Sequence, residues 1–409
     1  MRRRTYLATT AATATTLAVA GCMGGDDADD AEENGEDDDP GETHPDAAGV
    51  FDDFEDLEAW ETLLGSMSGD DAHTTGSQAA LLTGSTEDEQ VRIRRQLDEP
   101  ADFSAVLPAM TLATENQWAV PYLQLHDADG DRMDFRGRVN GGVGPTACNF
   151  GLTNVEGEPD LSEVTEIQVL YWLGEETEGE LWVDDLHFTP RPETGKVMIQ
   201  LVGGYETHYT TALSILESHD LPAAAFVPTG RIRSFDDAEG NRLTEDQLAE
   251  LDDAGWTIAS NGAHGLDLTT LEDRDPADEI ADAQAWLEDN GYEDGSRYFA
   301  FPGNNYDAAS MDLVADHHDL AFTSGFSNVG YATNPHNVPR LDSPSEPLAR
   351  DALDWTAELG SITTIAFYTL QEEGPAALEA TAEHLADLEA AGDVEVVLPG
   401  DLTEHVYEG

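Results

Sequence analysis

The feature that most constrains the fold is a regular alternation of short apolar runs and longer amphipathic segments, which begins at residue 196. Such runs have the length of buried strands, and the amphipathic segments have the length and period of helices. Strands are predicted at 196–202, 223–228, 256–259, 297–301, 319–323, 361–368 and 393–398. Helices are predicted at 207–218, 244–254, 276–290, 307–316 and 375–391. About seven strands with their helices predict a parallel β/α barrel, whose site is built by the loops after the strands.

Residues 50–190 follow a different pattern, with short alternating segments between turn signals, and this predicts an all-β sandwich. The opening FDDFEDLEAWETLLGSMSGDDAHTTGSQAALLTGS and the closing LWVDDLHF resemble a jelly-roll carbohydrate-binding module. This resemblance implies sugar binding, although such sandwiches also serve as spacers. The candidate platform aromatics are Trp118, Tyr122, Tyr171 and Trp172. For Trp172 and Trp182 a place in the core is the favoured interpretation.

The N-terminus is predicted to be a targeting segment. Arg3-Arg4-Thr5-Tyr6-Leu7 resembles a twin-arginine (Tat) export signal, and Val19-Ala20-Gly21-Cys22 resembles a lipobox. Residues 1–22 are therefore expected to be a lipoprotein signal, with Cys22 as the lipidated residue. The acidic residues 23–49 are expected to form a disordered tether. The prediction is an exported lipoprotein on the extracellular face, attached to the membrane through its lipid anchor only.

The strongly acidic composition limits which kinds of partner the chain can bind. Among 409 residues, 85 are acidic and 18 are basic, which gives a net charge of -67. A carboxylate-coated surface repels itself until salt screens it, so we expect a salt-loving host of the haloarchaeal type. Nucleic acid is excluded as a partner because phosphate contacts need Lys and Arg. Once Cys22 is lipidated only Cys148 remains, so no intramolecular disulfide is expected.

The C-terminal region, residues 195–409, resembles a polysaccharide deacetylase of the NodB type. KVMIQLVGGYETHYTTALSILESHDLPAAAFVPTGRI is similar to the first block of that family, and LAELDDAGWTIASNGAHGLDLTTL to its second. RYFAFPGNNYDAASMDLVADHHDLAF is similar to the third block, and SITTIAFYTLQ to the last strand. The resemblance implies a distorted (β/α)7 barrel of the glycoside hydrolase/deacetylase type. It also implies removal of acetyl groups from sugars, with a divalent metal, usually zinc, held by one aspartate and two histidines.

The residues that carry this chemistry in the family are largely substituted here. Val202 stands where the family has its general-base aspartate, and Gly203 where it has the metal-binding aspartate. Ser260 replaces the first histidine ligand, whereas His264 keeps the second. Tyr368 stands at the position of the acid histidine, and the third block loses its arginine. We therefore predict no catalytic residue and no cofactor.

These observations favour a surface lipoprotein that is catalytically degenerate and binds polysaccharide or another glycan. Its predicted substrate-binding residues are Tyr205, Asn261, Asn304, Asn305 and Tyr368 in the barrel, and Trp118 and Tyr122 in the sandwich. One alternative is an active carbohydrate deacetylase, a hydrolase of non-peptide C–N bonds, with zinc at a rearranged site. That site would use His264 and His208, with His336 as a further candidate. A second alternative is a structural protein of the cell envelope.

Overall fold

The computed structural model describes residues 48–174, 176–234 and 241–407. The predicted signal, the lipidation site Cys22 and nearly all of the predicted tether lie outside these residues. In the described part of the chain, none of the helices combines the length and the apolar character that a membrane crossing requires.

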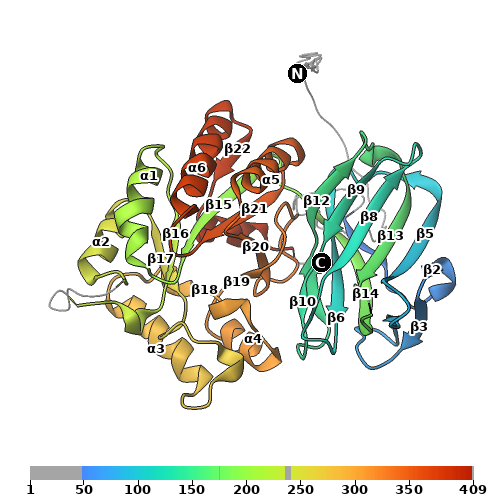
Figure 1. The fold of residues 1–409 in the computed structure, drawn as a ribbon, viewed down its shortest axis with the longest axis horizontal. Coiled ribbons are helices and arrows are strands. Elements are labelled where there is room, and N and C mark those ends of the chain that lie inside the picture. The colour runs from blue at the N-terminus through green and yellow to red at the C-terminus, as the bar shows by residue number, and fades with distance from the viewer. Residues whose placement is uncertain (1–47, 175, 235–240, 408–409) are drawn as a thin grey trace, which may run out of the picture. The chain divides into compact units, whose positions relative to one another are not determined.

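The first part of the described chain forms two antiparallel sheets of six strands each (Figure 1). The first sheet contains β11 (Thr146–Asn149), β6 (Val106–Ala113), β14 (Gly179–Pro190), β4 (Ala79–Gly84) and β3 (Ser66–Asp70), with β1 (Gly49–Asp52) also paired to β14. The second has the order β12 (Gly151–Glu156), β9 (Arg132–Arg136), β8 (Pro121–Asp127), β13 (Val164–Trp172), β5 (Gln90–Ala101) and β2 (Glu61–Leu64). A separate two-stranded ribbon joins β7 (Trp118–Ala119) to β10 (Val139–Asn140).

One buried cluster joins these two sheets. It takes Leu82 and Leu112 from the first sheet, and Ile93 and Leu125 from the second. Alternate residues of each strand point to opposite faces, so each sheet presents one apolar face to this shared core. The prediction that this region is built of β-strands is confirmed, with antiparallel pairing, and the jelly-roll arrangement stays a prediction.

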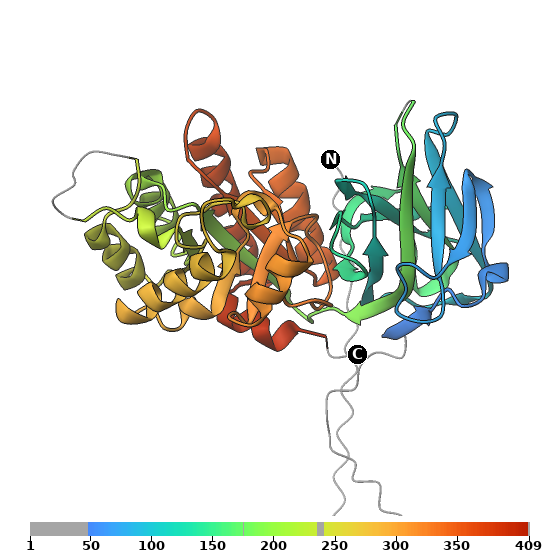
Figure 2. The same cartoon turned by 90° about the horizontal axis from the view of Figure 1, so that it is seen from below.

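The second part of the described chain is a closed parallel barrel of seven strands (Figures 1 and 2). Its strands are β15 (Gly195–Val202), β16 (Ala224–Val227), β17 (Thr257–Ser260), β18 (Tyr298–Ala300), β19 (Leu320–Ser324), β20 (Val338–Asp342) and β21 (Ile362–Phe367). β21 pairs with β15, and β15 pairs with β16, which closes the ring. The strand β22 (Val394–Val396) pairs with the amino-terminal half of β15.

Helices surround the barrel strands (Figure 2). They are α1 (Ser214–Glu217), α2 (Glu245–Asp253), α3 (Pro276–Asp289), α4 (Ala308–Ala315), α5 (Glu346–Leu359), α6 (Gly374–Ala391) and α7 (Pro399–Leu402). The predicted helix at 207–218 begins with a π-helical segment, His208–Leu213, before α1.

Two barrel elements were not predicted. The strand β20 contains Pro339, Arg340 and Asp342, and proline and charge inside a run argue against a buried strand. The helix α5 follows Pro344 and carries Pro347 in its first turn, so its start has the composition of a loop. Proline is tolerated there because the first N–H groups of a helix have no partner within the helix. As a result, the predicted set of seven strands was wrong in one member: β20 belongs to the ring and β22 lies beside β15.

The faces of β15 determine where its side chains lie. Val197, Ile199 and Leu201 pack in the layer between the strands and the helices. Met198 and Val202 belong to a second buried cluster with Phe226. Because side chains alternate along a strand, Gln200 shares the face of Met198 and Val202, which is the interior of the barrel.

Candidate functional site at the carboxyl ends of the barrel strands

The end of β15 places an apolar side chain where the sequence comparison expected an acid. Val202 is 3% exposed and packs in the barrel interior. Gly203 follows it, and the Gly203 N–H donates to the Phe226 carbonyl on the next strand at 2.8 Å. Neither residue can bind a metal or accept a proton through its side chain.

The space beside Gly203 is occupied by Tyr205. Gly203 has φ +104°, and a Cβ atom built there would lie 2.6 Å from Cε2 of Tyr205. Tyr205 is held in place by Arg242, whose guanidinium carbon lies 4.1 Å from the centre of its ring. Nη1 of Arg242 also donates to the Gly203 carbonyl. An aspartate at position 203 would therefore need both backbone strain and movement of Tyr205.

The end of β17 carries Ser260, where the resemblance predicts a histidine, and the following loop carries His264. Ser260 is completely buried, and its hydroxyl accepts the N–H of Gly262 at 3.2 Å. His264 is partly exposed, and its Nδ1 lies 2.8 Å from Oε1 of Glu279. The backbone N–H of His264 donates to the other oxygen of Glu279, also at 2.8 Å. Glu279, which is 2% exposed, thus fixes both the loop and the ring orientation of His264.

His208, the other predicted ligand, is a buried residue of the first turn after β15. Its Nε2 lies 3.0 Å from the Tyr368 carbonyl, and its ring is fully buried. Burial lowers the pKa of His208 to about 4, with the Tyr368 carbonyl opposing that shift. His208 is therefore neutral at ordinary pH and ties the start of its helix to the loop after β21.

A buried arginine occupies the barrel interior near the carboxyl ends of the strands. Arg340 is 0% exposed and lies on β20. Its Nη2 donates to Oδ1 of Asn304 at 2.6 Å, and its Nη1 to Oε1 of Gln200 at 3.3 Å. Its Nε lies 3.4 Å from Oδ1 of Asp342. A buried charge is tolerated when it is paired and hydrogen-bonded. Both Nη atoms donate hydrogen bonds and Asp342 pairs with the charge, while Nε has no hydrogen-bond partner within the described residues.

Tyr368 and Asn304 complete this polar network. The Tyr368 hydroxyl donates to Oδ1 of Asp342 at 2.7 Å, and Nδ2 of Asn304 donates to Oδ2 of Asp342 at 3.1 Å. Burial raises the pKa of the Tyr368 hydroxyl, with Arg340 opposing and Asp342 reinforcing the shift. We call Gln200, Asn304, Arg340, Asp342 and Tyr368 the interior network. It is a set of mutually bonded groups, because each polar side chain in it bonds to at least one other member.

The remaining predicted barrel residues lie in different surroundings. Asn261 is 5% exposed and donates to the Ala300 carbonyl at 2.7 Å, so it ties the loop after β17 to the end of β18. Asn305 is exposed and donates to Oδ2 of Asp267 at 2.8 Å. His336 is held by the His318 carbonyl, which lies 2.8 Å from its Nε2.

The predicted platform aromatics also separate into exposed and covered residues. Trp118 is 51% exposed, whereas Tyr122 is covered by Arg136, whose guanidinium carbon lies 4.2 Å from the ring centre. Tyr171 is buried. Trp182 is buried as expected, but Trp172 is 54% exposed, so its predicted place in the core was wrong. Its position at the end of β13 explains this, because a terminal strand residue lies beyond the sheet that covers the core.

The donor set at the strand ends does not fit a catalytic metal. Catalytic zinc sites use three protein ligands, and Val202, Gly203 and Ser260 offer no carboxylate or imidazole. Among the residues that the structure describes, no group of three or more His, Cys, Asp or Glu side chains is placed to hold a metal ion. His208 and His264 are each bonded to a different partner, the Tyr368 carbonyl and Glu279.

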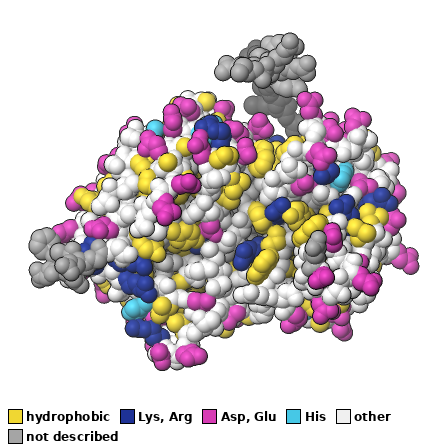
Figure 3. Space-filling view, viewed as in Figure 1, with side chains coloured by type: hydrophobic (Ala, Val, Ile, Leu, Met, Phe, Trp, Pro, Cys, Tyr) yellow, Lys and Arg dark blue, Asp and Glu magenta, His cyan; other side chains and the backbone are white. Residues whose placement is uncertain are grey.

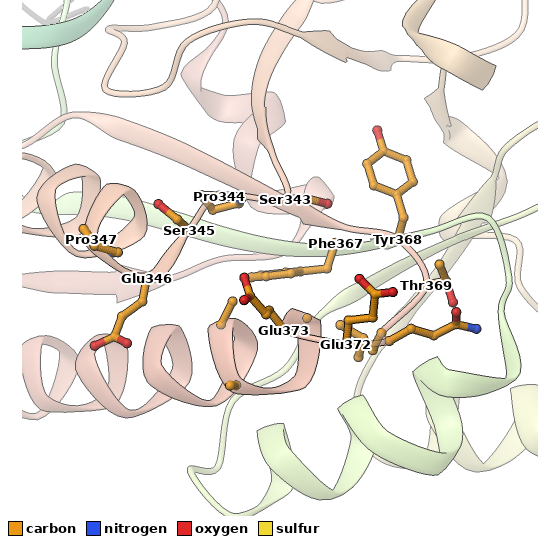
Figure 4. Close-up of a pocket in the computed structure, with 15 residues that line it drawn as sticks. Ser343, Pro344, Ser345, Glu346, Pro347, Phe367, Tyr368, Thr369, Glu372 and Glu373 are labelled. Atoms are coloured by element: carbon orange, nitrogen blue, oxygen red, sulfur yellow. The ribbon is translucent and has the colours of Figure 1, made fainter.

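A cavity of about 620 Å³ lies beside the loops that follow β20 and β21 (Figure 4). Glu346, Glu372 and Glu373 are among its lining residues. The ring of Tyr368 points away from the other labelled side chains, which agrees with its bond to Asp342. This acidic cavity therefore lies outside the interior network, apart from Tyr368 at its edge.

A model of the polysaccharide deacetylase family matches residues 191–319. This match supports a polysaccharide deacetylase domain in the C-terminal half of the chain. The matched segment includes Val202, Gly203, Ser260 and His264, whereas Tyr368 lies beyond it. No curated protein is significantly similar to the chain.

Solved structures with similarity to this chain include three carbohydrate esterases. A family 4 carbohydrate esterase from Streptomyces lividans, in complex with acetate, is 16% identical over 50% of this chain and 94% of its own, with a TM-score of 0.37. A family 4 carbohydrate esterase from Bacillus anthracis is 17% identical over 53% of this chain and 86% of its own, with a TM-score of 0.36. A family 4 acetyl xylan esterase from Clostridium thermocellum, in complex with a cobalt ion, is 16% identical over 51% of this chain and 90% of its own, with a TM-score of 0.34.

Sequence reasoning missed two functional-site features. Arg340 was missed because its strand was read as a loop, since the proline and the charges in VPRLD give no signal for a buried strand. Arg242 was missed because its role depends on the distant Tyr205, and sequence spacing does not show such contacts.

Proposed function

We propose that this chain is an exported surface lipoprotein that binds carbohydrate and has lost the deacetylase reaction. One observation carries the proposal: Val202 and Gly203 stand at the end of β15 where two carboxylates are expected, and Tyr205 fills the space beside Gly203. Hydrolysis of an acetyl group needs an activated water and a group that takes its proton. The side chains at these positions supply neither.

The interior network supports the same proposal. Its guanidinium and carboxylate are bonded to each other and to Asn304, Gln200 and Tyr368. A general base must be within hydrogen-bond reach of the proton that it takes. Asp342 already accepts two hydrogen bonds, from Tyr368 and Asn304, so it is engaged in holding the barrel together.

The carbohydrate part of the proposal rests on a concave surface that combines an exposed aromatic side chain with polar groups. Ligand sites combine apolar or aromatic walls with a few polar groups that fix orientation. Trp118 and Asn305 both line one groove of about 360 Å³. The export and lipid anchor rest on the twin-arginine and lipobox motifs that end at Cys22.

Binding and catalysis are tested separately on the chain from Asp26 onward, without a histidine tag and in molar KCl. Acetate release is measured from acetylated chitin oligomers and acetylated xylan, with zinc or cobalt added. The expected result is no release above that of the buffer with metal. Release that depends on His264 would overturn the loss of catalysis and favour the rearranged active site.

Glycan binding is measured by retention on a panel of immobilised polysaccharides. The expected result is retention that weakens when Trp118 is changed to Ala and persists when Trp172 is changed to Ala. These two residues are similarly exposed, at 51% and 54%, which makes Trp172→Ala a matched control. Retention no better than that of an acidic control protein would overturn carbohydrate binding and leave the structural envelope protein.

A further inference from the structure

The groove that contains Trp118 combines an exposed aromatic ring with an arginine, whereas the interior network has no exposed aromatic ring. Its volume is about 360 Å³, within the ~300–1,000 Å³ of ordinary ligand sites. Trp118 lies on β7, and Arg138 directly precedes β10. Asp267 and Asn305 lie in the loops after β17 and β18. A hydrogen bond from Nδ2 of Asn140 to the Asn304 carbonyl, at 3.3 Å, links the ribbon to those loops.

Trp118 supplies the apolar surface of this groove. It is paired with Asn140 in the ribbon, and half of its surface is open. A tryptophan on a strand has two side-chain torsions, so little conformational entropy is lost when a ligand stacks on it. Its position on a hydrogen-bonded ribbon keeps the indole beside the loops.

Arg138 supplies the charge. Its guanidinium carbon lies 5.7 Å from the centre of the Trp118 ring. Its Nε is buried and has no hydrogen-bond partner within the described residues. In those residues no carboxylate lies within ion-pair distance of Arg138 either, although the chain carries 85 acidic residues against 18 basic ones.

The carboxylates that line the same groove are engaged elsewhere. Glu115 lies 3.1 Å from Nε2 of His73. Asp267 accepts the N–H of Thr269 at 2.9 Å and Nδ2 of Asn305 at 2.8 Å. Asp307 accepts the N–H of Ser310 at 2.9 Å, as the N-cap of α4. The guanidinium therefore lies in a groove whose own acids bond to other partners.

We infer that this groove binds a saccharide that carries an anionic group, with the sugar ring on Trp118 and the anion at Arg138. The inference rests on the proposed carbohydrate binding and adds the class of sugar. A guanidinium offers a planar fork of donors that matches a carboxylate or sulfate in a bidentate way. The hydroxyl oxygens of a neutral sugar could also accept hydrogen bonds from Arg138, but a carboxylate or sulfate adds a charge-assisted contact, which is the stronger kind.

The net charge sets the conditions for the test. A chain of net charge -67 repels anionic ligands at long range, whereas the contact with Arg138 acts at short range. The screening length falls to about 3 Å at 1 M salt, so molar KCl suppresses the repulsion more than the contact. Figure 3 shows acidic side chains spread over the visible face of the molecule, which is the source of that repulsion.

The experiment is isothermal titration of the chain from Asp26 onward in molar KCl. The probes are galacturonic acid trisaccharide, its fully methyl-esterified form and a sulfated galactose trisaccharide. The variants are Arg138→Gln, Trp118→Ala and the control Arg350→Gln, which removes an exposed arginine of α5. We expect one or both anionic probes to bind about fivefold or more tighter than the ester, because a charge-assisted contact contributes about 1 kcal/mol or more.

The outcomes separate this inference from the proposed function. Arg138→Gln should remove the preference for the anionic probes over the ester, and Arg350→Gln should keep that preference. Tighter binding of the galacturonic acid probe would identify a carboxylate as the anion, and tighter binding of the sulfated probe would identify a sulfate. Equal binding of ester and acids, lost on Trp118→Ala, would overturn the anionic class and leave carbohydrate binding intact. Absence of binding by all three probes, together with no retention on any polysaccharide, would overturn both.

Discussion

Replacing Arg340 by Met should strongly destabilise the barrel. The change removes the donors to Asn304 and Gln200 and the cation beside Asp342. Each buried acceptor left without its donor costs about 1–3 kcal/mol, and breaking a buried ion pair on one side costs about 3–5 kcal/mol. Asp342 keeps the Tyr368 hydroxyl and Asn304, and its side chain is 22% exposed, so the lower part of that range applies.

We therefore expect the free energy of unfolding of the barrel to fall by about 3–4 kcal/mol, and its Tm to fall by roughly 6–16 °C. The assay is urea unfolding in molar KCl, followed by tryptophan fluorescence, to which the barrel contributes Trp256, Trp286 and Trp355. The double variant Arg340→Met/Asp342→Leu is the control. It should lose less stability than the sum of the two single variants, because it leaves no unpaired charge. A loss below about 1 kcal/mol in Arg340→Met would refute the view that the interior network holds the barrel together.

Three further predictions concern pH, salt and thiol chemistry. The pKa of His208 is lowered to about 4 from 6.5, so the unfolded chain binds the proton more tightly than the folded chain. The free energy of unfolding should therefore fall as the pH drops from about 6.5 to about 4. His208→Gln should make this fall with pH smaller. Raising KCl from about 0.1 M to molar concentration should raise Tm because it screens a net charge of -67, and an unchanged Tm would contradict the charge argument. Burial raises the pKa of the Cys148 thiol to about 12, so it should resist a thiol reagent in the folded chain and react once urea unfolds it; rapid reaction of the native chain would show that Cys148 is accessible.

The sequence was sufficient for those parts of the fold that depend on local periodicity. The strands near 196–202 and 224–227 are mostly apolar on both faces, and the helices near 276–289 and 374–391 have clear periodic faces. The strand β20 was not predictable in this way, because Arg340 becomes a buried strand residue only when Gln200, Asn304 and Asp342 surround it. Of these partners, Gln200 and Asn304 lie far from Arg340 in the sequence.

The candidate site was predictable in its losses and less so in its contacts. Val202, Gly203 and Ser260 are predicted to be substitutions because the blocks around them resemble the family pattern. The contact between Arg242 and Tyr205, which fills the space beside Gly203, could not. The same holds for Arg138 beside Trp118, since the ribbon that brings them together has two residues in each strand.

The central claim is that the ends of the barrel strands hold no catalytic metal, because one histidine remains of the expected ligands. The most direct measurement is divalent metal per chain after exhaustive dialysis and after reloading with zinc, beside His264→Ala. The account predicts no stoichiometric metal in either protein, since a single histidine falls short of the three protein ligands of a catalytic zinc site. About one zinc ion per chain that disappears in His264→Ala would contradict the account and show a rebuilt metal site.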